Sequence, residues 1–164
     1  MKSIIASALL VLVSIPTSKA QTQSPLVNWV SFQEAIVQSP EANKKVLVDI
    51  FAPWCGWCSK MQDEAYMDKE ILKYLESNFI TARLDISIQD DTLHYNDLAL
   101  PSAHLAAGFG AEGTPTTVFL TDQGEYITRL PGYVKPDEFL TVLKFIATDS
   151  YRTETFAEFS LSGK

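Results

Sequence analysis

Histidine and cysteine are scarce in this sequence, which has two residues of each type among its 164. A structural zinc site takes about four such ligands, and the two histidines, His94 and His104, lie ten positions apart. A c-type haem site needs a histidine directly after the second cysteine of a Cys-x-x-Cys pair, where this chain has Ser59. The sequence therefore predicts neither a metal site nor a haem site.

Positive charge is also sparse. The 13 lysines and arginines face 20 aspartates and glutamates, which gives a formal net charge of -7, and no basic run occurs. Proteins that bind nucleic acid carry patches or stripes of positive charge, so no nucleic-acid partner is predicted. A hydrophobic content of 46% with 20% charged residues is ordinary for a globular protein, and the length suits one domain.

Only one apolar run stands out, at residues 4–15, and it is shorter than the ~20 residues that a membrane-spanning helix needs. A lysine precedes it, and small residues follow at the two positions that a signal peptidase reads, Ser18 and Ala20. We interpret residues 1–20 as a signal peptide cleaved near Ala20, with a membrane anchor as the alternative. The domain at 21–164 is then periplasmic or secreted, in a compartment where disulfides persist.

The two cysteines, Cys55 and Cys58, are separated by only two residues. Residues 46–51 before them are apolar and β-branched, which predicts a buried strand, and residues 59–65 after them predict a helix. A cysteine at a helix N-terminus faces unpaired N–H groups and a partial positive charge, which favour the reactive thiolate. The spacing lets the two sulfurs form a disulfide with each other. Strand, Cys-x-x-Cys and helix together are typical of thiol–disulfide exchange.

Several local signals predict the neighbouring elements. Ser31 and Glu34 form a capping box for a helix that should end before Pro40. Asp68 is a good N-cap for a second helical segment, and residues 79–86 predict another strand. Two strands joined by a helical crossover pair in parallel.

The second half of the chain is predicted in less detail. Residues 87–113 are the least regular part, with a short helix at 103–109. Strands at 116–120 and 125–130 form a hairpin, and a final helix opens at Pro136. The tail adds a short amphipathic turn through Phe156 and Phe159.

Two segments resemble the thioredoxin superfamily. Residues 48–58, Val-Asp-Ile-Phe-Ala-Pro-Trp-Cys-Gly-Trp-Cys, are similar to its active-site segment, and residues 113–116, Gly-Thr-Pro-Thr, to the segment that carries its cis-proline. The match covers roughly 29–147 and implies an α/β thioredoxin fold. Its central sheet is mixed, has four to five strands and is flanked by helices, with an insertion before the cis-proline and a C-terminal extension. The small periplasmic members are the most similar.

The resemblance implies roles for the residues around the cysteine pair. Cys55 is the attacking thiol and Cys58 the resolving thiol. Asp49, a lone acid on an apolar strand, is expected to be buried with a raised pKa and to help move the proton of Cys58. Arg83 stands where cytoplasmic thioredoxins have a lysine. Arginine keeps its proton and would lower the pKa of Asp49 if the two paired. The sequence therefore leaves undecided whether Asp49 relays the proton.

The resemblance also implies a substrate-binding surface. Trp54, Gly56 and Trp57 would border the client chain, although Trp54 is equally well explained as a core residue. Pro115, if cis, would turn the backbone so that Thr114 pairs with an extended client strand.

We therefore predict an exported enzyme that reduces protein disulfides by two-cysteine exchange through a mixed disulfide. It needs no cofactor beyond the Cys55–Cys58 pair. Its partners are client proteins with disulfides and a membrane or soluble thiol–disulfide electron donor, and it is a monomer. The alternatives are a thiol oxidase or isomerase of the same compartment, a non-catalytic peptide-binding module of this fold, and a purely structural disulfide.

Overall fold

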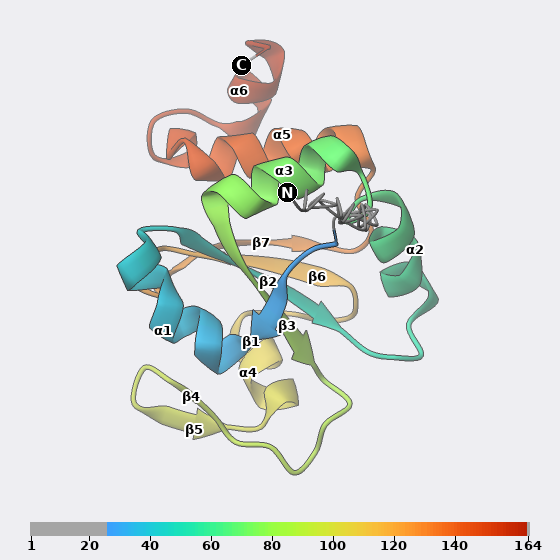
Figure 1. Ribbon diagram of the computed structural model, residues 1–164, viewed down its shortest axis with the longest axis vertical. Helices are drawn as coiled ribbons and strands as arrows, with labels where there is room; N and C mark the ends of the chain where they lie inside the picture. Colours follow the sequence, from blue (N-terminus) through green and yellow to red (C-terminus); the bar gives the residue numbers. More distant parts are fainter. Residues whose placement is uncertain (1–25, 164) are drawn as a thin grey trace, which may run out of the picture.

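The computed structural model describes residues 26–163 (Figure 1). The predicted signal peptide and its cleavage site lie outside the described residues. Within residues 26–163, no helix is both long and apolar enough to cross a membrane.

A five-stranded sheet forms the centre of the molecule, in the order β1-β3-β2-β6-β7. Its strands are β1 (Trp29–Ser31), β2 (Lys45–Phe51), β3 (Phe79–Asp85), β6 (Thr116–Leu120) and β7 (Tyr126–Pro131). The strand β3 pairs in parallel with both β1 and β2, whereas β6 runs antiparallel to β2 and β7 antiparallel to β6. The sheet is therefore mixed, and the predicted thioredoxin fold is confirmed.

The central strand β2 is buried on both faces. Its side chains alternate, as in any strand, so that Leu47 enters one hydrophobic core while Val46, Val48 and Ile50 enter the other. The apolar, β-branched sequence of this strand suits a position between two layers of helices. Burial on both faces fixes the strand on which the cysteine-bearing turn is mounted.

Helices cover both faces of the sheet (Figure 1). On one face lie α3 (Lys69–Asn78) and α5 (Pro136–Ala147), and on the other lie α1 (Phe32–Ala42) and α4 (Ser102–Gly108). The helix α2 (Gly56–Glu64) follows β2 directly, and Asp68 caps α3 as predicted. This layering leaves α2 at the end of the sheet where β2 terminates.

The capping box at the start of α1 is confirmed. The Ser31 hydroxyl accepts from the N–H of Glu34 at 3.2 Å, and the Glu34 carboxylate accepts from the N–H of Ser31 at 2.8 Å. These bonds lower the pKa of Glu34, chiefly through the backbone bond from Ser31. The two reciprocal bonds satisfy donors that would otherwise have no partner within the helix.

Replacing Ser31 with alanine should destabilise the protein by about 1 kcal/mol, because the cap bond is lost while no core contact changes. Urea unfolding would measure the effect. The matched control is Ser77→Ala, which removes an exposed hydroxyl from the last turn of α3, where it bonds only to the Lys73 carbonyl. An equal change in both variants would show that the cap contributes nothing.

The predicted end of α1 before Pro40 is wrong, because the helix continues to Ala42. Proline has a helical φ, and inside a helix it removes the bond from its own nitrogen and crowds the carbonyl four residues before it. The carbonyl of Ile36, which that bond would have used, instead accepts from the Ser39 hydroxyl at 3.5 Å. Asn43, in the left-handed conformation, then closes the helix with its N–H on the Pro40 carbonyl.

The segment before the cis-proline contains more structure than predicted. The short helix α4 was expected, but the hairpin of β4 (Leu93–Tyr95) and β5 (Leu98–Leu100) was not. Its turn consists of Asn96 and Asp97, both with positive φ. The tail forms η1 (Ser150–Arg152) and α6 (Phe156–Leu161), in which Phe156 and Phe159 pack on Phe145.

Candidate active site

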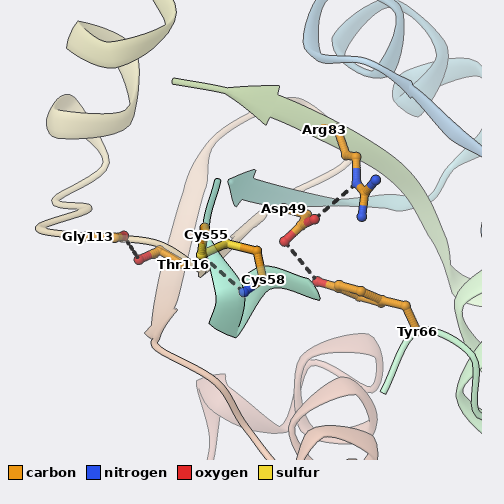
Figure 2. Close-up of a disulfide and its surroundings, with 7 residues drawn as sticks. All are labelled: Asp49, Cys55, Cys58, Tyr66, Arg83, Gly113 and Thr116. Atoms are coloured by element: carbon orange, nitrogen blue, oxygen red, sulfur yellow. Dashed lines mark hydrogen bonds and ion pairs between the residues drawn. A yellow bond between two sulfur atoms is a disulfide. The ribbon is translucent and has the colours of Figure 1, made fainter. Parts of the chain in front are cut away.

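Cys55 and Cys58 form a disulfide at the start of α2 (Figure 2). Cys55 is the N-cap residue, and the N–H of Cys58 donates to its Sγ at 3.1 Å. Both cysteines are partly exposed. In the reduced state, the same N–H and the helix terminus would favour negative charge on the Cys55 sulfur. The geometry that the sequence predicted for a reactive thiol is therefore present.

Asp49 is almost completely buried, with 2% of its surface exposed. The guanidinium of Arg83 donates to its Oδ2 at 3.1 Å, and the hydroxyl of Tyr66 lies 3.4 Å from its Oδ1 (Figure 2). Burial raises the pKa of Asp49 to about 6, although Arg83 and Tyr66 act in the opposite direction. Desolvation thus outweighs the ion pair, and the pKa of this carboxyl group lies above its ordinary value.

The partner of Asp49, Arg83, is itself held on several sides. Its guanidinium lies between the rings of Trp29 and Phe51, at 4.5 and 4.8 Å from their centroids. It also donates to Oε1 of Gln62, on α2, at 2.5 Å. Arginine fits such a position because it is planar and stacks on aromatic faces. Sequence reasoning missed these three neighbours, which come from three different elements.

Two tryptophans flank the disulfide on the surface. Trp54 is 76% exposed and Trp57 is 59% exposed, so Trp54 is not a core residue. The Trp57 ring packs on that of Tyr133 at 5.7 Å, and the ammonium of Lys60 lies over both rings, at 5.2 and 4.8 Å. Glu64 pairs with Lys60 at 4.0 Å and accepts a hydrogen bond from the Tyr133 hydroxyl. This group ties α2 to the loop after β7.

The Thr114–Pro115 peptide bond is cis. The loop is fixed by two hydrogen bonds, from the Thr116 hydroxyl to the Gly113 carbonyl and from the N–H of Gly132 to the Pro115 carbonyl, each 2.8 Å long (Figure 2 shows the first). Thr114 is half-buried, and no hydrogen bond within residues 26–163 uses its backbone N–H or carbonyl. Both groups are therefore free to pair with another chain.

Metal ligands do not gather anywhere in the described part of the chain. No group of three or more histidine, cysteine, aspartate or glutamate side chains there has the arrangement of a metal site.

Comparison with known proteins gives one family match and several distant relatives. A family model described as a thioredoxin-like domain matches residues 32–147. The thiol:disulfide interchange protein DsbD of Colwellia psychrerythraea is 26% identical over 134 residues, which cover 79% of this chain and 21% of the relative. The chain spans about a fifth of the length of such curated relatives.

Solved structures resemble the chain in fold. A thioredoxin from Thermus thermophilus has a TM-score of 0.60 and 24% identity, with 72% of this chain and 85% of that protein covered. A protein described as DsbH oxidoreductase has a TM-score of 0.56 and 19% identity, with 87% and 95% covered. Identities this low support the architecture alone.

Proposed function

Since the chain belongs to the thioredoxin-like domain family, we propose that it is an exported thiol–disulfide oxidoreductase that reduces disulfides in client proteins. The observation that carries the proposal is the position of the Cys55–Cys58 disulfide, partly exposed at the N-terminus of α2. The similarity to thiol:disulfide interchange proteins supports the same class of chemistry. The apolar run at residues 4–15 supports export.

The proposed reaction has two exchange steps. The Cys55 thiolate attacks one sulfur of the client disulfide, forms a mixed disulfide, and releases the other client sulfur as a thiolate that takes up a proton. Cys58 then loses its proton and attacks the Cys55 sulfur. This attack forms the Cys55–Cys58 disulfide and releases the second client sulfur as a thiolate, which also takes up a proton. The client gains two electrons and two protons, and a donor dithiol protein restores the reduced enzyme.

Asp49 is the proposed acceptor of the proton that Cys58 loses. A carboxyl group with a pKa of about 6 is largely ionised at neutral pH and still basic enough to take part in proton transfer. Arg83 keeps its own proton and holds one carboxylate oxygen. Its role is to orient Asp49, so the relay passes through one titrating group.

The client chain would bind across the exposed surface beside Cys55. Thr114 offers an unpaired N–H and carbonyl for strand addition next to Pro115. Trp54 and Trp57 would supply apolar contact area. Gly56 places no side chain between them, and apart from its chain neighbours and the backbone of α2 no atom lies within 4 Å of an added Cβ. The enzyme would work as a monomer without a bound cofactor.

We expect the Cys55–Cys58 pair to have a reduction potential near that of thioredoxin, which is about -270 mV. A strongly oxidising member of this class has a potential of about -120 mV instead. Strong oxidants stabilise the thiolate heavily, but Gly56 and Trp57 bring no charge between the cysteines. The ammonium of Lys60 lies over the Trp57 and Tyr133 rings and pairs with Glu64. Equilibration with glutathione buffers would measure the potential. A value above about -150 mV would overturn the reductase direction in favour of an oxidase.

Insulin reduction tests the proposed activity itself. Reduced protein should precipitate the insulin B chain in the presence of dithiothreitol, at a rate well above dithiothreitol alone. A protein that binds unfolded polypeptide but gives no acceleration would instead be a non-catalytic peptide-binding module.

A further inference from the structure

A recess of about 220 Å³ lies directly beside the cis-proline. Its walls include Thr114, Pro115 and Gly132. A client strand paired with the backbone of Thr114 would therefore run along one wall of this recess. Side chains of a strand alternate between its two faces, so some client side chains near the reactive cysteine would point into it.

The recess contains one cation and one anion, Arg129 and Glu112. An arginine Nη2 and a glutamate Oε1 lie 3.8 Å apart, and the two side chains are 38% and 93% exposed. Ion pairs this exposed contribute at most about 1 kcal/mol. Glu112 is therefore a loosely held partner that another carboxylate can replace.

The fold determines where the Arg129 side chain begins and which backbone its guanidinium rests on. Arg129 lies on β7, where it pairs with Val118 of β6. Its guanidinium lies against Gly110, which has a φ of 77°. A Cβ atom at Gly110 would come within 2.4 Å of the arginine Nη1. The absence of a side chain at this position lets the guanidinium rest on the loop at the recess.

We propose that this recess is a subsite for a carboxylate of the client polypeptide, an aspartate or glutamate within a few residues of the reactive cysteine. The proposal rests on the proposed disulfide exchange and adds a preference among its clients. Guanidinium groups bind carboxylates through two parallel hydrogen bonds, which are stronger than neutral ones. Glu112 pairs with the Arg129 guanidinium when no client is bound. It therefore competes with the client carboxylate for the same group.

The overall charge of the protein makes this preference distinctive. A net charge of -7 repels acidic polypeptides at long range. A faster reaction with an acidic client would therefore have to come from a local contact. Arg129 is the cation at the recess that provides it.

Peptides joined by a disulfide to one common quencher would test the subsite. They carry glutamate, glutamine or lysine at one of the four positions within two residues of the cysteine. At one position or more, kcat/KM for the glutamate peptide should exceed that for the glutamine peptide by about three- to tenfold, as expected for one partly exposed charge-assisted contact. Equal values at all four positions would overturn the proposal.

Two variants should move the preference in opposite directions. Arg129→Gln should reduce the ratio of glutamate to glutamine rates to about one, and Glu112→Gln should increase it by removing the competitor. Arg152→Gln is the matched control, since it removes an exposed arginine that lies beside Asp149 and lines a different recess. A ratio unchanged in Arg129→Gln would overturn the assignment of this residue.

Hydroxyethyl disulfide, which is small and uncharged, separates the subsite from the redox chemistry. A protein that reduces neither this compound nor any peptide would lack the proposed activity altogether. A protein that reduces it, and all peptides at one common rate, would keep the proposed activity and lose only the subsite.

Discussion

Replacing Cys58 with alanine is expected to convert the protein into a trap for its clients, whereas replacing Cys55 should reduce activity to the uncatalysed background. The reason is that only Cys55 sits at the N-cap of α2 and accepts the N–H of Cys58. Its thiolate can attack without Cys58, but the mixed disulfide then has no resolving thiol. Disulfide-linked complexes should accumulate in the Cys58→Ala variant.

Non-reducing electrophoresis after acid quenching would detect these complexes, with the reduced variants incubated with disulfide-bonded insulin or a cell extract as the source of clients. Ser59→Ala, one position further along the helix, is the control and should turn over without trapping. Equal trapping by the two cysteine variants would contradict the assignment of Cys55 as the attacking thiol. Trapping by Cys55→Ala alone would reverse it.

Replacing Asp49 with asparagine should change stability in a pH-dependent way. The free energy of unfolding of the variant, relative to that of the native chain, should be higher at pH 8 than at pH 4. The folded-state pKa of Asp49 is raised from 3.8 to about 6 by burial. The folded protein therefore binds more protons than the unfolded chain between these values, and its stability falls as the pH rises through them. A shift of this size corresponds to a loss of up to about 3 kcal/mol, complete above the folded pKa.

Urea unfolding of the oxidised native protein and the Asp49→Asn variant, at several pH values from 3.5 to 8, would measure the difference. Other titrating groups cancel in the comparison. Arg83→Met should act in the opposite direction, because Arg83 lowers the pKa of Asp49 and its removal would extend the loss to higher pH. Parallel curves for the native protein and Asp49→Asn would show that Asp49 does not titrate as proposed.

Local sequence signals predicted much of the fold because each one is complete within a few residues. The capping box at Ser31, the N-cap at Asp68 and the first-turn proline at Pro136 all occur where expected. The three-residue strand β1 escaped prediction, since its pairing with residues 81–83 lies far along the chain. The β4–β5 hairpin has strands equally short, too short to show a period.

The residues of the site also fall into those that local sequence predicts and those that it does not. Cys55, Cys58 and Pro115 belong to motifs that can be read along the chain, and Asp49 stands out as an acid within an apolar strand. The rings around Arg83, and Tyr133 beside Trp57, are brought together only by tertiary packing. A stacked arginine and a half-buried tyrosine in a loop have no signature of their own in a sequence.

The side chains of β2 point alternately to the two faces of the sheet, and this limits which mutations the strand can accept. Leu47 and Asp49 point toward α3 and α5, while Val48 and Ile50 point toward α1 and α4. Swaps among apolar residues of similar size cost little in such a core. The deletion or insertion of a single codon within residues 45–51 would instead shift the register and exchange the two faces. It would carry the carboxylate into an apolar layer, away from Arg83. The fold should therefore tolerate a change in the length of this strand less well than a change among its apolar side chains.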